Sequence, residues 1–216
     1  KITGRTYPEG WGLVAAVLVS IVVGSMFVHR TPALTDKDTI VLADFSNTTG
    51  DPVFDDTMRQ GLAVQLQQSP FLSLISDQRI RRTLLLMNQE ADARLTPDIA
   101  HGVCVRTGSA AVLEGSIATL GNQYVLGLRA KNCTTGDILA DEQAQAERKE
   151  EVLSTLSQIA TRFRRRAGES LATIEKHSTP LEEATTPSLE ALQAFSVGSS
   201  GIRSTVDWGR RPPHYQ

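Results

Sequence analysis

A short polar stretch between Leu42 and Leu62, LADFSNTTGDPVFDDTMRQGL, gathers four aspartates, an asparagine and two glycines. Oxygen ligands this close together could hold a cation. The same residue types also build turns, and Asn47, Asp51 and Pro52 are ordinary turn residues. Asp55 and Asp56 would follow in the first turn of a helix and cap it, because the helix dipole favours negative charge there. We favour a joint between a strand and a helix, with a metal or phosphate site as the alternative.

Other combinations that could do chemistry are weak. The tripeptide Asp44-Phe45-Ser46 mimics the metal-binding tripeptide of kinases only superficially, because no glycine-rich phosphate loop or catalytic loop accompanies it. No Gly-x-Ser-x-Gly elbow occurs, and none of the four histidines has ligand spacing with another histidine, a cysteine or a carboxylate pair. They are His29, His101, His177 and His214. We therefore expect no catalytic residue, no metal site and no cofactor.

The basic cluster RFRRR spans Arg162 to Arg166. On a helix, Phe163 would face the core and the arginines would fan outward to pair with nearby glutamates. Contact with anionic lipid headgroups is the alternative. Nucleic acid is not an expected partner, because 22 basic residues against 24 acidic ones give a net charge of -2 and a pI near 6.1.

Hydrophobic periodicity and turn residues predict the elements that position these groups. The residues TIVLADF (39–45) are apolar on both faces and predict a central strand. The pattern then gives a helix from Phe54 that ends near Pro70, a strand at 71–76, and helices at 77–89, with Asp77 as N-cap, and from Thr96 to Gly108. The remaining predicted elements are three strands, at 109–120, 123–133 and 137–147, and one long helix at 152–174. The predicted order is β-α-β-α-α-β-β-β-α, an α/β domain with a mixed sheet.

An uncharged segment near the start, WGLVAAVLVSIVVGSMFV, is long enough to cross a bilayer. We predict a transmembrane helix at 11–29, with a signal peptide or a buried core helix as alternatives. Residues 1–10 would be a cytoplasmic juxtamembrane stub. The chain begins with Lys1 rather than Met, so we expect it to be a piece of a longer protein.

Several motifs in order resemble a known family. The run TIVLADFSNTTGDPVFDDTMRQGL, then FLSLIS, then VRTGSAAVLEGSIATLGNQYVLGLRAKNCTTGDILADEQAQA resembles the TolB-N-terminal-like domain of multidomain bacterial signalling proteins. It is most similar to membrane-anchored eukaryotic-like serine/threonine protein kinases of acidobacterial type. In those proteins a kinase domain precedes the membrane helix, and the α/β domain and tetratricopeptide repeats follow it outside the cytoplasm. The resemblance covers roughly residues 11–195.

The resemblance implies a single-pass protein of the bacterial inner membrane with its main domain in the periplasm. The expected parts are a linker at 30–38, the α/β domain at 39–176, a second linker at 177–187, and a degenerate or truncated start of a tetratricopeptide-like region at 188–216. From Gly201 onward the sequence departs from the repeat. The domain would be a non-catalytic sensing or protein-interaction module of a receptor-like kinase. The alternative is a periplasmic envelope-assembly or scaffold protein with a signal anchor, and the upstream coding sequence discriminates the two.

The two cysteines, Cys104 and Cys133, lie late in a predicted helix and at a predicted hairpin end. An extracytoplasmic location allows a disulfide between them. The strand that ends at Cys133 returns antiparallel toward the exit of the Cys104 helix, which could bring the two β-carbons within reach. The alternative is that they serve as two separate small apolar residues.

Overall fold

A computed structural model describes residues 34–35, 38–185 and 188–194, which belong to one compact unit that begins at Leu34. The transmembrane helix predicted at 11–29 lies outside these residues. Among the helices of the described ranges, none is both long enough and apolar enough to span a bilayer.

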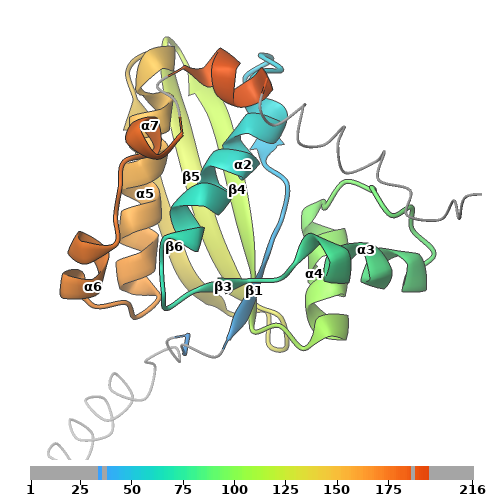
Figure 1. Ribbon diagram of the computed structural model, residues 1–216. Coiled ribbons are helices and arrows are strands. Elements are labelled where there is room, and N and C mark those ends of the chain that lie inside the picture. Colours follow the sequence, from blue (N-terminus) through green and yellow to red (C-terminus); the bar gives the residue numbers. More distant parts are fainter. Residues whose placement is uncertain (1–33, 36–37, 186–187, 195–216) are drawn as a thin grey trace, which may run out of the picture. The chain divides into compact units, whose positions relative to one another are not determined.

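A mixed six-stranded sheet forms the centre of the unit (Figure 1). Its strands run in the order β3-β1-β4-β5-β6, with β2 also paired to β4. β1 is parallel to both of its neighbours, whereas β4, β5 and β6 form an antiparallel meander. The bounds are β1 Thr39–Leu42, β2 Ser46–Asn47, β3 Ser73–Leu74, β4 Ala111–Leu120, β5 Gln123–Asn132 and β6 Ile138–Ala146. The predicted mixed α/β class is confirmed.

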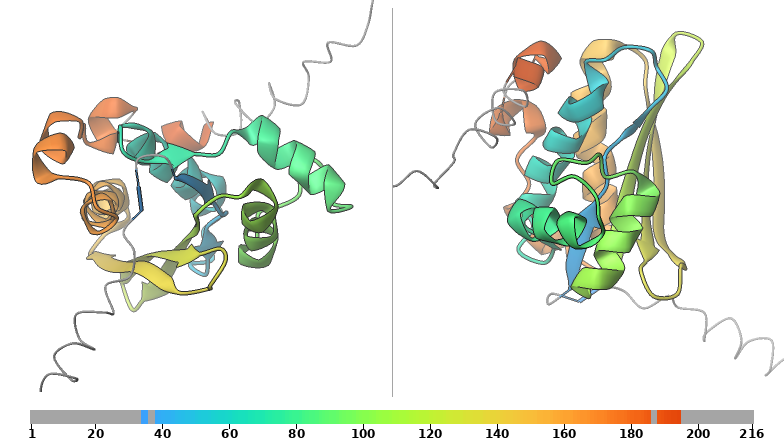
Figure 2. Two further views of the ribbon diagram at one scale, coloured as in Figure 1. Left: turned by 90° about the horizontal axis from the view of Figure 1, so that it is seen from below. Right: turned by 90° about the vertical axis from the view of Figure 1, so that its right-hand side faces the viewer.

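Helices cover the two faces of the sheet in separate layers (Figures 1 and 2). α2 (Phe54–Gln67) and α5 (Val152–Arg166) pack together on one face, and α5 contacts β5 and β6. α3 (Asp77–Leu86) and α4 (Pro97–Thr107) form the other layer, where α4 contacts β1 and β4. The 3₁₀ turn η1 (Lys149–Glu151), α6 (Leu171–Lys176), α7 (Leu181–Ala184) and a helical segment at 189–194 complete the unit.

Each layer encloses its own apolar cluster, as alternation along the strands requires. The larger cluster lies under α2 and α5 and includes the fully buried Phe54 and Phe163. The smaller one lies under α3 and α4, and Val41 and Val112 point into it. On that side the β4–β5 hairpin extends past α4 (Figure 2, right). The sheet is therefore covered on both faces around β1, the strand that carries the candidate site.

Local capping explains why α4 matches its predicted bounds. Thr96 Oγ1 accepts a hydrogen bond from Ile99 N, and Pro97 occupies the first helical turn, where its missing N–H costs nothing. Gly108 ends the helix with φ 65°, a left-handed conformation that glycine adopts freely. The start of α3 differs from expectation, because the N-cap is Ser76 and Asp77 is the first helical residue.

Two other predicted elements are shorter in the structure. The strand predicted at 71–76 is present as β3, which pairs with β1 at Ser73 and Leu74, and Ile75 N also donates to Ile40 O over 3.0 Å. The long helix predicted at 152–174 ends at Arg166, and Gly168, with φ 114°, separates it from α6, which Ser170 caps. The apolar periodicity continued across this break because Ile174 of α6 returns to the core and is also buried. Periodicity alone therefore could not reveal the turn.

Candidate functional site

A cleft of about 830 Å³ opens at the carboxyl end of β1. It lies between α2, α3 and the loop at 91–95, and Asp44, two residues after β1, lines it. The chain connections diverge at β1, which lies between β3 and β4 in the sheet. The connection from β1 to β3 passes through α2 on one face, whereas the connection from β3 to β4 passes through α3 and α4 on the other face. Ligands of open α/β sheets bind in the crevice at such a switch point. Fold topology therefore singles out this cleft.

The walls of the cleft are strongly charged. Five aspartates and three arginines line it, over a floor of apolar side chains, and this excess of carboxylates makes it acidic. Ile80 and Leu84, both buried, supply part of the floor. The charged residues are Asp44, Asp55, Asp56, Asp77, Asp92, Arg59, Arg81 and Arg94. A floor of this kind with a polar rim is the usual composition of a binding site.

Asp44 fixes one end of the cleft. Its backbone N–H donates to Leu95 O over 2.9 Å, and its Oδ2 accepts from Leu95 N over 2.7 Å. Its Oδ1 lies 3.1 Å from Arg59 Nε, and its Oδ2 lies 4.0 Å from Arg94 Nε. One carboxylate thus joins the end of β1, helix α2 and the 91–95 loop, which holds the walls of the cleft in place.

The polar stretch after Asp44 is built as a joint. Asn47 Oδ1 accepts from the N–H and the hydroxyl of Thr49, while Asn47 Nδ2 donates to Asp51 O and to Asp55 Oδ1, both over 2.9 Å. Asp51 Oδ1 accepts from Val53 N. The side-chain oxygens of Asn47, Asp51 and Asp55 thus accept hydrogen bonds from other groups of the same stretch. Within the described ranges, no three His, Cys, Asp or Glu residues are grouped to hold a metal ion.

The joint differs in one detail from the sequence prediction. Asp55 and Asp56 do lie in the first turn of α2, but the N-cap residue is Val53, and no side chain caps the helix. Asp51 Oδ2 instead accepts a hydrogen bond from Lys149 Nζ over 2.7 Å. This hydrogen bond is the main reason why the pKa of Asp51 lies below its ordinary value. The same contact raises the pKa of Lys149. The joint is therefore tied to the turn before α5.

Cys104 and Cys133 are brought together by the fold. The structure joins them as a disulfide with Cα atoms 6.0 Å apart, within the usual range. Both side chains are buried in the smaller apolar cluster, where they link α4 to the end of β5. The pairing would hold the α4 layer against the sheet. Its formation in the exported protein stays a prediction.

The arginine cluster of α5 does not behave as one solvated face. Arg162 and Arg166 extend to Glu142 of β6, as expected for arginines that pair with nearby glutamates. Arg164 instead is only 1% exposed and points inward, so its predicted outward position was wrong. Its Nε and Nη2 donate to the two oxygens of Glu169 over 2.9 and 2.8 Å. The charge of Arg164 is therefore balanced inside the protein by Glu169, and the pair serves the structure rather than the surface.

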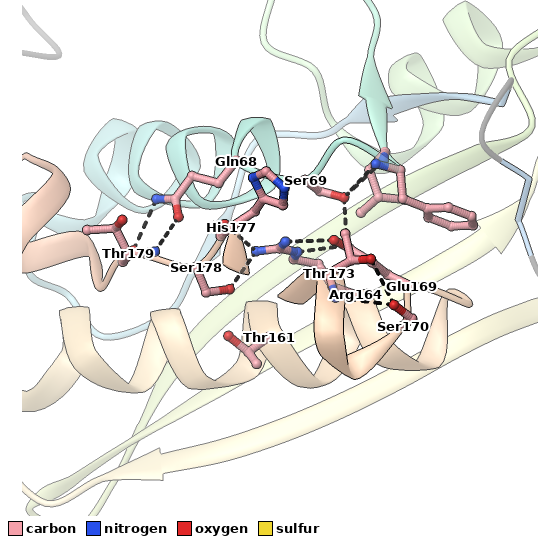
Figure 3. Close-up of polar contacts among 12 residues, drawn as sticks. Gln68, Ser69, Thr161, Arg164, Glu169, Ser170, Thr173, His177, Ser178 and Thr179 are labelled. Atoms are coloured by element: carbon pink, nitrogen blue, oxygen red, sulfur yellow. Dashed lines mark hydrogen bonds and ion pairs between the residues drawn. The ribbon is translucent and has the colours of Figure 1, made fainter. Parts of the chain in front are cut away.

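The buried pair connects three segments (Figure 3). Glu169 Oε2 also accepts from Ser69 Oγ over 2.6 Å, at the end of α2, and Arg164 Nη1 donates to Ser178 Oγ over 2.9 Å. Burial by itself would raise the pKa of Glu169, but hydrogen bonds from Arg164 and Ser69 and the Arg164 charge outweigh it, so the pKa is lowered. Glu169 therefore stays ionised against Arg164.

Sequence reasoning missed most of the residues that form the cleft. Arg59 lies on α2, whereas Asp92 and Arg94 lie on the 91–95 loop, and the two segments share no motif. The pairing of Arg59 and Arg94 with Asp44 requires the tertiary fold. One signal was available. Asp44 directly follows a predicted central strand, and residues that follow such strands lie at the carboxyl edge of the sheet.

Comparisons with known proteins add a fold-level likeness. No family model and no curated protein matches the chain. Among solved structures, the LpoB C-terminal domain from Salmonella enterica is 18% identical with a TM-score of 0.48, covering 58% of this chain and 93% of its own. Lipoprotein GNA1162 from Neisseria meningitidis is 16% identical with a TM-score of 0.43, covering 62% and 98%. TolB from Acinetobacter baumannii is 12% identical with a TM-score of 0.41, covering 63% and 30%. Likeness at this level does not extend to function.

Proposed function

We propose that the described unit is a non-catalytic protein-interaction module that works outside the cytoplasm and receives its partner in the cleft at the carboxyl end of β1. The cleft carries the proposal, because it combines a switch-point position with a volume of about 830 Å³, an apolar floor and a charged rim. Asp44 and Leu95 fix its walls through paired hydrogen bonds. A pre-formed site of this kind binds without a large ordering cost.

The buried Cys104–Cys133 pair supports the extracytoplasmic part of the proposal, since disulfides persist in oxidising compartments. The finer assignment rests on the sequence. We propose that residues 11–29 anchor the module in the bacterial inner membrane, as part of a receptor-like serine/threonine kinase with a tetratricopeptide-like region from 188. The envelope-scaffold alternative predicts the same cleft and differs in what precedes Lys1.

Site-specific photocrosslinking in cells tests the module. A photoreactive amino acid replaces Asp56 of α2 or Asp92 of the 91–95 loop, which are both exposed and line the cleft. Gln145, exposed on the outer face of β6, is the matched control position. We expect one defined adduct from both cleft positions and none from Gln145. The adduct should also disappear when Asp44→Ala detaches the 91–95 loop.

Equal labelling at all three positions, or an adduct that survives Asp44→Ala, would contradict the cleft as the binding site. The compartment is tested separately with a membrane-impermeant thiol reagent on a Gln145→Cys variant in intact spheroplasts. Labelling is expected if the unit lies outside the inner membrane. Protection until lysis would place it in the cytoplasm and refute that part of the proposal.

A further inference from the structure

The segment that follows α6, described at residues 177–185 and 188–194 and called here the 177–194 segment, is held against α2 by hydrogen bonds of its backbone. Thr179 N donates to Gln68 Oε1 over 2.6 Å, and Thr179 O accepts from Gln65 Nε2 and Gln68 Nε2 over 3.0 and 3.1 Å. Leu181 N donates to Ser157 Oγ of α5 over 3.1 Å. Side chains of both helices thus satisfy the backbone of a segment that the sequence marks as a linker.

Leucines of the same segment fill the groove between α2 and α5. Leu181, Leu189 and Leu192 are 0%, 5% and 1% exposed and belong to the larger apolar cluster. Leu189 and Leu192 stand three residues apart, so they share one face of their helical turn. Removing leucine side chains from water stabilises the packing of the segment, so the groove holds it in place.

Gly61 of α2 shows that the groove is shaped for this segment. A Cβ at this position would lie 2.9 Å from Leu181 Cδ2, 3.1 Å from Leu156 Cδ2 and 3.6 Å from Leu192 Cδ2. Glycine weakens a helix interior relative to alanine. At Gly61 the missing side chain gives the leucines of the segment their close approach to α2.

Polar contacts hold both ends of the segment. Arg164 donates to Ser178 Oγ and to His177 O over 2.9 and 3.5 Å at the beginning. Near the end, Lys149 Nζ lies 3.8 Å from Glu190 Oε1 while it bonds Asp51 of the joint. The segment therefore runs along the α2–α5 groove from the buried arginine to the joint next to the cleft.

We propose that the α2–α5 groove is a recognition surface for a leucine-bearing helical segment, and that the chain's own residues 177–194 occupy it in cis. The folded unit then extends past the boundary predicted at 176 and includes residues 177–185 and 188–194. Docking of an apolar helical face into a groove is a common recognition mode, used here within one chain.

Hydrogen exchange of the full chain, followed by mass spectrometry, tests the proposal. We expect amides at 181–184 and 189–194 to exchange as slowly as the ends of α5. Leu192→Ala should speed exchange across 177–194 about tenfold or more, because it empties a buried site. Leu171→Ala, at a leucine that is 58% exposed on the neighbouring α6, is the matched control and should leave the segment unchanged. Amides of β4 and β5 report whether the rest stays folded.

Gly61→Val provides an independent variant on the opposite wall, and it should release the segment while β4 and β5 stay protected. Fast exchange of 177–194 in the unmodified chain would overturn the proposal, as would an unchanged segment in both Leu192→Ala and Gly61→Val. Protection that falls on dilution, together with isotope-mixed dimers by native mass spectrometry, would show that a second copy supplies the segment and would overturn occupation in cis.

Discussion

Removing one member of the buried Arg164–Glu169 pair should destabilise the unit more than any surface change. Both side chains are 1% exposed, and two charge-assisted hydrogen bonds join them. Glu169→Ala leaves a guanidinium buried without its counter-charge, a loss that typically costs about 3–5 kcal/mol. Domains of this size are stable by only about 5–15 kcal/mol, so the variant should approach the limit of folding.

Replacing both partners should cost less than replacing one. In Arg164→Met/Glu169→Met no charge stays buried, and such exchanges are often neutral or stabilising. Ser69 and Ser178 lose a partner each in this variant, and each lost hydrogen bond costs about 1 kcal/mol. We therefore expect the double variant to be more stable than either single variant by at least about 2 kcal/mol.

Urea unfolding of the purified chain measures these differences. With a slope of about 2 kcal/mol per molar urea, a loss of 4 kcal/mol moves the midpoint by about 2 M. The exposed pair of Arg129 and Asp141 is the matched control, with side chains 48% and 46% exposed. Asp141→Ala should change stability by no more than about 1 kcal/mol. A double variant that costs the sum of its single variants would refute the reasoning.

The same pair predicts a dependence on pH. The pKa of Glu169 is lowered in the folded state. Its contribution to stability is therefore present above its ordinary pKa of 4.5 and is lost as pH falls through the lower folded value. Compared with the unmodified chain, Glu169→Gln should lose less stability over this acid window. Equal acid profiles of the two proteins would contradict an ionised Glu169.

Three further predictions follow from other contacts. Protein is taken from the envelope with its thiols blocked before lysis, and non-reducing mass mapping should then give a peptide linked through Cys104 and Cys133. Two alkylated cysteines would contradict both the disulfide and the proposed compartment. The purified chain with ATP and magnesium should release no phosphate above buffer, whereas turnover that Asp44→Ala abolishes would overturn the joint. Lys149→Met should raise the pKa of Asp51 toward its ordinary 3.8 in an NMR titration, because its strongest partner is removed, and an unchanged pKa would disprove that contact.

Local chemistry determined much of the fold directly from the sequence. Thr96, Pro97 and Gly108 set the ends of α4, since a cap, a fixed φ and a left-handed glycine act over one helical turn. The alternation in 123–132 gave β5 and its buried face for the same reason. The order of elements and the mixed sheet followed from these signals, and the two-residue β2 was missed because so short a strand has no periodicity.

Tertiary structure alone decided the cleft and the buried pair. The cleft needs Asp44 to meet Leu95, which lies on a loop beyond two intervening helices, and no local pattern encodes that meeting. A sequence of four arginines around one phenylalanine favours exposure, because burial of a lone charge is costly. Arg164 is buried only because the turn at Gly168 brings Glu169 back and the fold supplies Ser69, which lies 100 positions before Glu169 in the sequence. The partners that offset the cost of burying the charge exist only once the chain has folded.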